Sequence, residues 1–205
     1  MDVIDKNGNT PLILACFNKS EKIALELLEH PEKCMLVKEN RFGFTAFSMA
    51  CGASLEKVAL KILEYPEKYK LDLATISCNT PLIMACINSL EKVILKMLEY
   101  PEKCGLNYAN ARGNTAFSIS CWHGLEKIAL KILEHSNKCV LNKINRDGNT
   151  PLIFACYSDS EKLSLKILEY YEKCDIDHVN NNEETALYYA QRNDLYEVIL
   201  KIMDV

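Results

Sequence analysis

The sequence contains ten cysteines and four histidines, side chains that could form disulfides, bind a metal or catalyse a reaction. Three histidine–cysteine pairs have three residues between their members, a spacing that suggests paired ligands. A structural zinc ion takes four ligands, whereas each pair offers two and no Cys-x-x-Cys occurs. We therefore expect no metal site and no cofactor. The pairs are His30 with Cys34, His135 with Cys139, and Cys174 with His178.

Motifs for nucleophilic catalysis and phosphate binding are missing from the sequence. It contains no Gly-x-Gly-x-x-Gly, no Walker loop and no Gly-x-Ser-x-Gly elbow. His123, beside Trp122, stands apart from the three pairs. Because no nucleophile or acid partner accompanies it, we expect a contact residue and not a catalyst. The sequence predicts a protein that is not an enzyme.

The elements that must position these residues follow from a strict internal period. Threonines recur every 35 residues, and each is followed five residues later by alanine or serine and fifteen residues later by leucine. Such a period predicts repeats that pack on their neighbours. We expect a single domain over 1–205, with repeats at about 1–35, 36–70, 71–105, 106–140, 141–175 and 176–205. The threonines are Thr10, Thr45, Thr80, Thr115, Thr150 and Thr185.

Each unit has the pattern of a helix, a turn, a second helix and an extended link. Thr10-Pro11 suits a helix start, because threonine caps a helix and proline fits its first position. Links rich in Asn and Gly predict tight, hairpin-like turns. Stacking the pairs buries apolar surface that no single pair could bury alone. The second helix is amphipathic, and we expect its N-terminal cap at Ser54, Ser89, Gly124, Asp159 and Asp194.

The same period places nine of the ten cysteines in two columns of equivalent positions. Equivalent atoms of adjacent helix pairs lie about 10 Å apart, whereas a disulfide needs Cα atoms within about 7 Å. We therefore expect reduced cysteines that serve as small buried apolar residues. Cys78 instead replaces a turn glycine, where we expect an exposed, oxidisable thiol. The columns are Cys16, Cys51, Cys86, Cys121 and Cys156, and Cys34, Cys104, Cys139 and Cys174.

The repeated segments resemble the ankyrin repeat over essentially the whole chain. The resemblance lies in Gly8-Asn9-Thr10-Pro11-Leu12 and its counterparts, in second-helix segments such as residues 59–63, and in tails such as residues 106–110. It implies an all-α fold, an ankyrin-repeat solenoid of stacked helix-turn-helix units with short hairpin-like links. The composition, rich in Asn and in Leu-Glu-Lys, is similar to that of ankyrin proteins of giant viruses of amoebae and of long arrays in protists and bacteria.

Several departures from the family's pattern affect the repeats. Each unit has 35 residues instead of the usual 33. The last unit carries Glu183-Glu184, Gln191 and Arg192 at positions that are mostly Gly-Asn, Cys and apolar elsewhere, so we expect it to act as a C-terminal cap. We also expect that the bracing usually provided by the histidine after Thr-Pro-Leu is absent. That histidine is replaced by Ile13, Ser48, Ile83, Ser118, Ile153 or Tyr188.

Charge and hydropathy exclude two classes of partner. The net charge is −4, and acidic and basic residues alternate without a clustered basic face, so we expect no nucleic-acid partner. No apolar run approaches the roughly 18 to 20 residues that span a bilayer, and the first residues lack a signal-peptide pattern. We expect no membrane association and an intracellular protein, cytoplasmic or nuclear.

The resemblance implies a concave groove, formed by the first helices and the hairpin tips, that grips partner proteins. Columns that recur in every unit are explained by packing, so specificity should lie in columns that vary. The position seven residues after each threonine varies, and it either forms an exposed apolar row or packs as ordinary core. The predicted partner-binding residues are Phe17, Phe42, Phe44, Ile87, Arg112, Trp122, His123, Arg146 and Tyr157.

These features predict a non-catalytic protein–protein interaction scaffold. We expect a partner held around Trp122, His123 and Tyr157, with a second contact at Phe42 and Phe44. One alternative is the substrate-recognition part of a larger adaptor, for example one that recruits a ubiquitin ligase through a segment outside this chain. We expect a monomer, and weak self-association through the apolar groove is a further alternative.

Overall fold

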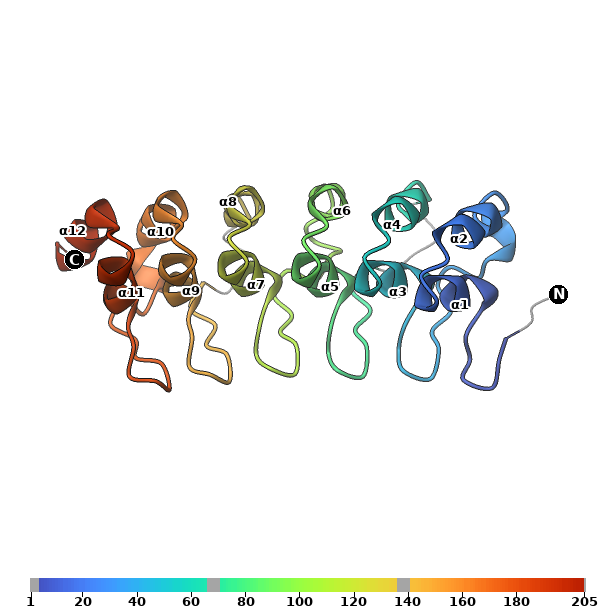
Figure 1. Cartoon of the computed structure of the whole chain (residues 1–205), viewed down its shortest axis with the longest axis horizontal. Coiled ribbons are helices and arrows are strands. Elements are labelled where there is room, and N and C mark those ends of the chain that lie inside the picture. The colour runs from blue at the N-terminus through green and yellow to red at the C-terminus, as the bar shows by residue number, and fades with distance from the viewer. Residues whose placement is uncertain (1–3, 66–70, 136–140, 205) are drawn as a thin grey trace. The chain divides into compact units, whose positions relative to one another are not determined.

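The computed structural model describes residues 4–65, 71–135 and 141–204. The chain divides into two compact units, Met1–Gly105 (unit 1) and Leu106–Val205 (unit 2). This division falls between the third and fourth predicted repeats, so each unit holds three helix pairs (Figure 1). The predicted all-α fold is confirmed, whereas a single domain over 1–205 stays a prediction.

Unit 1 consists of three helix pairs in two layers. The pairs are α1 (Pro11–Phe17) with α2 (Glu21–Leu27), α3 (Ala46–Gly52) with α4 (Glu56–Ile62), and α5 (Pro81–Ile87) with α6 (Glu91–Met97). A short 3₁₀ helix, η1 (Pro31–Lys33), follows α2. The first helices pack together, α1 on α3 and α3 on α5, and the second helices do the same, α2 on α4 and α4 on α6. Figure 1 shows the hairpin loops of this unit on the side of the first helices that faces away from the second helices.

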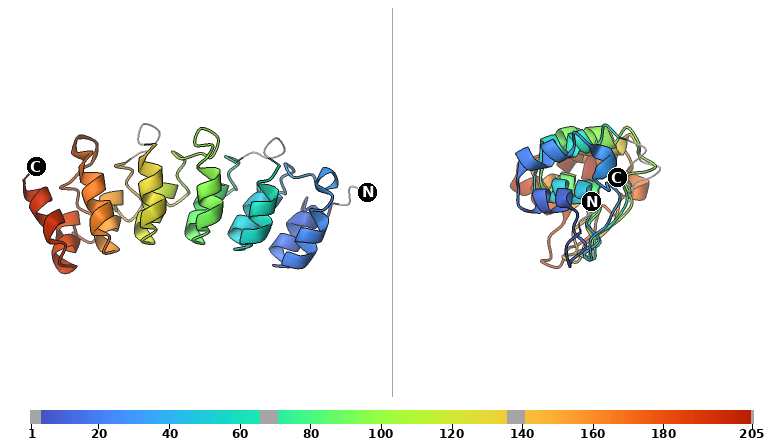
Figure 2. Two further views of the ribbon diagram at one scale, coloured as in Figure 1. Left: turned by 90° about the horizontal axis from the view of Figure 1, so that it is seen from above. Right: turned by 90° about the vertical axis from the view of Figure 1, so that its right-hand side faces the viewer.

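Unit 2 repeats this arrangement. Its pairs are α7 (Ala116–Trp122) with α8 (Glu126–Leu133), α9 (Pro151–Tyr157) with α10 (Glu161–Leu168), and α11 (Ala186–Arg192) with α12 (Tyr196–Met203). The 3₁₀ helix η4 (Tyr171–Lys173) follows α10. α9 packs between α7 and α11, and α10 packs between α8 and α12. Seen from above, the pairs of this unit stand side by side (Figure 2).

Every first helix has the predicted threonine as its N-cap. Each threonine hydroxyl accepts a hydrogen bond from the backbone N–H three residues later, for example Ile13 N to Thr10 Oγ1 at 3.2 Å. This bond satisfies one of the N–H groups that a helix start leaves unpaired. Proline follows in α1, α5 and α9, whereas Ser48 and Ser118 complete a capping box in α3 and α7. Repeats with proline and repeats with a capping box therefore stabilise the same helix start in different ways.

The predicted caps of the second helices are wrong by one residue. The caps are the residues that follow the predicted positions, such as Leu55 and Leu90, and they make no side-chain capping bond. Ser54, Ser89 and the equivalent residues instead have positive φ angles, between 53° and 63°. Each of them makes the tight reversal between the two helices. Polar residues and glycine suit this position because they tolerate the left-handed conformation. The same residue types also favour helix capping, so the sequence pattern does not distinguish the two roles.

Small and apolar columns form the core of each unit. The residue five positions after each threonine is buried in every repeat, from Ala15 at 6% exposure to Ala155 at 0%. The next column holds cysteines, all of them buried. The nine described cysteines are thiols, and burial raises the pKa of Cys16 to about 12 and that of Cys156 to about 11. The predicted burial is confirmed for this column and for Cys34 and Cys104 of the second column, whereas Cys174 is only partly buried. Cys78 is exposed as predicted, and Cys139 lies outside the described residues.

Hairpin tips of neighbouring repeats are joined by backbone hydrogen bonds. In unit 1, Arg41 N donates to Asn7 O at 2.9 Å. In unit 2, Arg146 N donates to Arg112 O at 2.9 Å. Tip glycines make this close approach possible: Gly148 has a φ of +79°, and an added Cβ would lie 2.8 Å from Asn181 N. The Asn-Gly pattern of the links thus reflects both turn geometry and contact with the next repeat.

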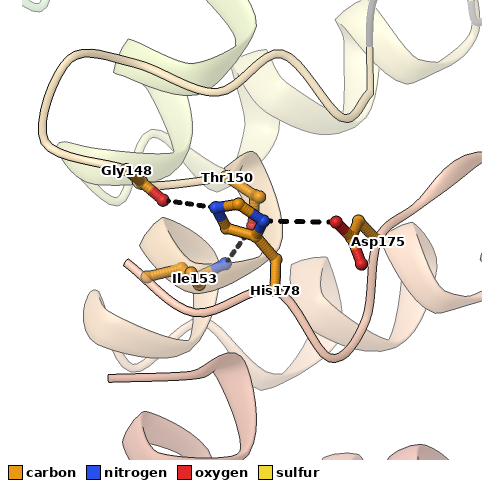
Figure 3. Close-up of polar contacts among 5 residues, drawn as sticks. All are labelled: Gly148, Thr150, Ile153, Asp175 and His178. Carbon is orange, nitrogen blue, oxygen red and sulfur yellow. Dashed lines mark hydrogen bonds and ion pairs between the residues drawn. The ribbon is translucent and has the colours of Figure 1, made fainter. Parts of the chain in front are cut away.

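A histidine braces repeats 5 and 6 inside unit 2 (Figure 3). His178 lies in the link before α11, and its Nε2 is 2.9 Å from the carbonyl oxygen of Gly148 in the preceding hairpin. Its Nδ1 is 3.2 Å from Asp175 Oδ2. Gly148 lies two residues before Thr150, which caps α9 by accepting a hydrogen bond from Ile153 N. No histidine follows Thr-Pro-Leu, so the sequence predicts no bracing by histidine between repeats. His178 nevertheless supplies a histidine contact between two repeats, from a different position.

The surface of the last repeat is mixed. Glu183, Gln191 and Arg192 are exposed, as a polar cap requires. On α12, however, Tyr196, Leu200 and Met203 are 68%, 58% and 72% exposed. A C-terminal cap therefore stays a prediction.

Candidate functional site

In unit 2, the hairpin tips and the first helices enclose a pocket of about 150 Å³, the unit-2 pocket. The helices contribute apolar and aromatic side chains, and the tips contribute mainly asparagines and two charged residues. Because the lining comes from three consecutive repeats, stacking and not local sequence creates the pocket. Its lining residues are Arg112, Asn114, Trp122, Asn145, Asp147, Asn149, Ile153, Phe154, Tyr157, Asn180, Asn182 and Tyr189.

Aromatic rings from successive first helices contact one another along this pocket. Trp122 of α7 stacks on Phe154 of α9, with ring centroids 5.8 Å apart and planes 25° apart. Tyr157 of α9 meets Tyr189 of α11 edge to face, with centroids at 5.2 Å. Trp122 and Tyr157 nevertheless remain 45% and 51% exposed. Ring packing therefore holds these side chains in place while part of each stays open to a ligand.

Paired asparagines hold the tips of unit 2 at a fixed spacing. Asn145 Nδ2 donates to Asn114 Oδ1 at 3.0 Å, and Asn180 Nδ2 donates to Asn149 Oδ1 at 2.8 Å. Asn145 Oδ1 also accepts from the backbone N–H groups of Asp147 and Asn149, which closes its own hairpin. Asn180 Oδ1 does the same in the next hairpin, so Asn145 and Asn180 each shape their own turn and join it to the preceding repeat.

At the last hairpin tip, the carboxylate of Glu184 accepts hydrogen bonds from its neighbours. Glu184 Oε2 accepts a hydrogen bond from Tyr189 Oη at 2.5 Å and another from Asn180 Nδ2 at 3.1 Å. The hydrogen bond from Tyr189 is the main reason that the pKa of Glu184 lies below its usual value. Burial, followed by the same hydrogen bond, raises the pKa of Tyr189 to about 12. The Tyr189 ring is therefore fixed against the pocket wall in its neutral form.

Unit 1 has a second concave surface, the unit-1 pocket, of about 400 Å³. It is apolar and lacks both arginine and acidic residues in its lining, where Lys19 is the charged group. Phe17 and Ile87 from the first helices are 66% and 42% exposed. The lining residues are Phe17, Lys19, Phe44, Met49, Gly52, Ala53, Asn79, Met84, Ile87 and Asn88.

The asparagine pairing is interrupted inside unit 1. Asn40 Nδ2 donates to Asn9 Oδ1 at 2.7 Å, as in unit 2. At the next junction the equivalent residues are Phe44 and Thr75, which cannot form this bond. Thr75 Oγ1 is buried without a hydrogen-bond partner. Replacing the pair therefore places a ring in the unit-1 pocket and leaves a buried hydroxyl unsatisfied.

Family models match the sequence at both ends. An ankyrin repeat model matches residues 7–37, and a model of three ankyrin repeats matches residues 129–204. Together they cover just over half of the chain. The chain belongs to the ankyrin repeat family. A search of curated proteins finds no match to this sequence.

Solved ankyrin structures have the same fold at low sequence identity. The ankyrin repeat domain of Bcl-3, described as a member of the IkappaB family, has a TM-score of 0.68 at 17% identity and covers 97% of this chain and 87% of that chain. An ankyrin repeat domain from Acinetobacter baumannii has a TM-score of 0.69 at 18% identity and covers 95% and 96%.

A third structure is a complex of a predatory endopeptidase from Bdellovibrio bacteriovorus with an immunity protein. Its matching chain has a TM-score of 0.69 at 19% identity, and the match covers 98% of this chain and 99% of that chain. At these identities the likeness establishes the ankyrin-repeat solenoid fold.

The predicted binding residues fall into two groups, one in each unit. Phe17, Phe44 and Ile87 line the unit-1 pocket, and Phe42 lies 46% exposed on a hairpin tip. In unit 2, Arg112, Trp122 and Tyr157 line the pocket. His123 and Arg146 lie outside that lining, although His123 contacts the Trp122 ring edge to face at 5.2 Å. The alternative of an ordinary buried core does not hold for the exposed side chains of this column, while their role in binding stays a prediction.

Sequence reasoning missed a second column on the same helix face. It lies four residues after each threonine and holds Phe154 and Tyr189 in unit 2 and Met49 and Met84 in unit 1. Residues three apart on a helix are neighbours, so this column lies beside the one that holds Trp122. Its variation between repeats was visible in the sequence and could have identified it.

The arginines and the lysines that pair with glutamates occupy different sides of the ankyrin repeats. The four arginines lie on hairpin tips (Arg41, Arg112 and Arg146) or at the end of a first helix (Arg192), and all are exposed. In the described part of the chain none of them forms an ion pair. Three lysines of the second helices instead pair with glutamates of the preceding repeat within each unit. Examples are Lys57–Glu21 at 3.0 Å and Lys162–Glu126 at 3.5 Å.

The described residues hold neither a metal-ligand cluster nor a membrane-spanning helix. Across 4–65, 71–135 and 141–204 there is no group of three His, Cys, Asp or Glu side chains that could hold a metal ion. No helix in these segments combines the length and apolar character that a bilayer crossing requires.

Proposed function

We propose that this ankyrin protein is a non-catalytic scaffold that binds a partner protein through its hairpin tips and first helices. Ankyrin repeats generally mediate protein–protein interactions, and the fold is generally non-catalytic. The observation that carries the proposal is a separation of surfaces. The exposed rings of Trp122 and Tyr157 on the first helices line one pocket with Arg112, which forms no ion pair within the described residues, whereas lysine–glutamate pairs lie on the second helices.

This separation matches the composition of protein interfaces. Trp, Tyr and Arg are enriched at interface centres, and Lys and Glu are depleted there. Trp122 and Tyr157 are held by ring contacts, so they would lose little conformational freedom on binding. Lysine–glutamate pairs on an exposed face contribute little stability and keep that face soluble.

An intracellular location is part of the proposal. The buried cysteine columns remain as thiols, which suits a reducing compartment such as the cytoplasm or nucleus. The net charge of −4 favours a protein partner over a nucleic acid.

The test is a comparison of partner capture by matched variants of the full chain. Trp122→Ala with Tyr157→Ala alters the proposed surface, and Glu126→Ala with Lys162→Ala alters the opposite face of the same repeats. Proteins captured by wild type should be lost with the first pair and kept with the second. Circular dichroism would confirm that both variants stay folded. The opposite pattern would place the binding surface on the second helices and refute the proposal.

A further inference from the structure

We infer that this chain forms a dimer in which the last repeats of two copies pack on each other, with α12 antiparallel to α12 of the second copy. The contact surface, the end face, consists of Tyr188 of α11 and of Tyr196, Leu200 and Met203 of α12. It contains none of the residues that line the unit-2 pocket, so the inference goes beyond the proposed function and replaces the monomer expected from the sequence.

The end face is apolar at positions that the earlier repeats bury. Met203 lies eighteen residues after Thr185 and is 72% exposed, whereas the leucine at this position is at most 4% exposed in each earlier repeat. Tyr188 lies three residues after Thr185 and is 44% exposed, whereas its counterparts are 0% or 1% exposed. Covering these side chains would therefore be favourable. The buried counterparts of Met203 are Leu28, Leu63, Leu98, Leu133 and Leu168.

A further repeat of the same type is a poor match for the end face. Inside the units, a glutamate eleven residues after the threonine pairs with a lysine of the next second helix, as Glu21 does with Lys57 at 3.0 Å. The same pair recurs at two further junctions. In the last repeat this position holds Tyr196, which is 68% exposed. An aromatic ring thus replaces the carboxylate that would join the next second helix, which favours a different occupant.

A head-to-tail stack of two copies also meets a mismatch. Such a stack would continue the internal junctions, with Asp5 in the place of the asparagine donor and Glu184 in the place of its acceptor. Side-chain hydrogen bonds are the main reason that the pKa of each of these carboxyls lies below its usual value. Two ionised carboxylates would therefore meet, and their repulsion disfavours an open, growing stack of copies.

The exposed side chains of α12 suit a closed, two-fold contact. Tyr196, Leu200 and Met203 follow one another at spacings of four and three residues, so they form one stripe along the helix. In an antiparallel pair centred on the middle of α12, Tyr196 of each copy lies opposite Met203 of the other. Two copies of the end face offer roughly 1,000 Å² of surface, which is the lower limit of specific interfaces. A weak dimer is therefore expected.

Charges at the edge of the stripe favour the antiparallel direction. Glu197 and Lys201 are the charged residues of α12, both are exposed, and neither forms an ion pair within the described residues. The antiparallel pair places Glu197 of each copy near Lys201 of the other, and the two-fold axis makes this contact twice. It also places Asp204, which follows α12, near the positive N-terminal end of the other α12. A parallel pair would instead bring like charges together.

Sedimentation equilibrium of the full chain at increasing concentration tests the dimer. We expect a monomer–dimer equilibrium, and Leu200→Ala should raise its dissociation constant about tenfold or more, because the side chain is lost from both copies. Ile23→Ala is the matched control: it removes a side chain that is 54% exposed on α2 of unit 1, and it should leave the equilibrium unchanged. Circular dichroism would confirm that both variants stay folded.

Charge reversal tests the antiparallel arrangement. Glu197→Lys alone and Lys201→Glu alone should each weaken the dimer, because each places like charges opposite one another at both contacts. An equal mixture of the two variants should dimerise again, since every contact between unlike chains then joins opposite charges. Loss of folding cannot produce this recovery, and a mixture that stays monomeric would refute the arrangement.

The remaining outcomes separate the inference from the proposed function. A wild-type chain that stays monomeric up to about 1 mM would refute the dimer. Assemblies that keep growing with concentration and that Ile23→Ala disperses would show head-to-tail stacking and would also overturn the inference. So would a dimer that is lost with Trp122→Ala, because it would form through the unit-2 pocket. Partner capture should be the same for Leu200→Ala and wild type, so failure of the dimer leaves the proposed function standing.

Discussion

The two units share one scaffold and differ in the surface that it presents. In both, a threonine caps each first helix, a small residue follows, and tip backbones are bonded from repeat to repeat. A buried cysteine comes next in every repeat except the last, where Gln191 is exposed. The unit-1 pocket, however, is lined by Phe17, Met49, Met84 and Ile87, whereas the unit-2 pocket has aromatic walls and a rim of asparagines with Arg112 and Asp147. Positions that serve packing are thus constrained in every repeat, and positions that face the pockets are free to diverge.

The tips show the same contrast. Unit 2 keeps its paired asparagines at both junctions between its repeats, whereas unit 1 replaces one pair by Phe44 and Thr75. Each unit also replaces one tip glycine, by Cys78 in unit 1 and by Glu183 in unit 2. Cys78 has a φ of 57°, a conformation that glycine adopts at lower cost. Unit 1 has therefore exchanged local stability at this tip for a different surface.

The largest effect is expected from deleting the buried phenylalanine of each unit. Phe47→Ala and Phe117→Ala remove rings that are 0% and 1% exposed, so each should lower the free energy of unfolding by about 3 to 5 kcal/mol. Hydrogen exchange should rise mainly in the unit that carries the substitution, because each repeat contacts only its neighbours. Equal increases in both units would instead show that the chain opens as one cooperative body.

A smaller effect is expected at the tip glycines. Gly148→Ala should cost about 3 kcal/mol, because φ is +79° and the new Cβ would meet the backbone of Asn180 and Asn181 at 2.9 and 2.8 Å. Gly8→Ala in unit 1 should cost only about 1 kcal/mol, since φ is +80° but the nearest atom is 3.4 Å away. Urea unfolding of both variants would measure the difference. Equal losses would mean that contact with the next tip contributes nothing.

The asparagine pairing can be tested by removing one of its members in unit 2 and by restoring one in unit 1. Asn145→Ala should destabilise unit 2 by about 2 kcal/mol, because it removes the bond to Asn114 and the acceptor for two backbone N–H groups. Thr75→Asn should stabilise unit 1 by about 1 kcal/mol, since it replaces an unsatisfied hydroxyl by a side chain that can close the turn. Urea unfolding measures both changes, and a loss of stability with Thr75→Asn would contradict this account of the tip.

The smallest effect is the pH dependence that Glu184 and Tyr189 give to the last repeat. The lowered pKa of Glu184 gives stability that is present above its unfolded pKa and is lost as the pH falls through the lowered value. The raised pKa of Tyr189 gives stability that is present below the ordinary tyrosine pKa of about 10 and is lost as the pH rises through about 12.

Absorbance titration of the tyrosines would measure the alkaline step. One tyrosine should ionise near pH 12, and Tyr189→Phe should remove that step. Glu184→Gln should move the step toward the ordinary value and flatten the loss of stability in acid. A titration that Tyr189→Phe leaves unchanged would refute the hydrogen-bonded pair.

Much of the fold could be predicted because the same sequence signals recur in every 35-residue repeat. The threonine caps, the buried alanine and cysteine columns and the hairpin glycines each follow from local chemistry that recurs in register. Prediction was weaker where two mechanisms favour the same residue types. Ser54 and Ser89 suited a helix cap by composition but make the left-handed reversal before the helix.

The ankyrin family, the helix pairs and the columns that are free to vary can all be read from the amino-acid sequence, because they follow from interactions within a repeat. The varying residues that meet one another are set by the stacking of the repeats. Trp122 and Tyr157 lie beside Phe154 and Tyr189, and Arg112 shares a pocket with Asp147, because residues from successive repeats are brought together by stacking. The physical reason is that contacts between repeats join residues about 30 or more positions apart, such as Asn145 with Asn114, and no local pattern specifies their geometry.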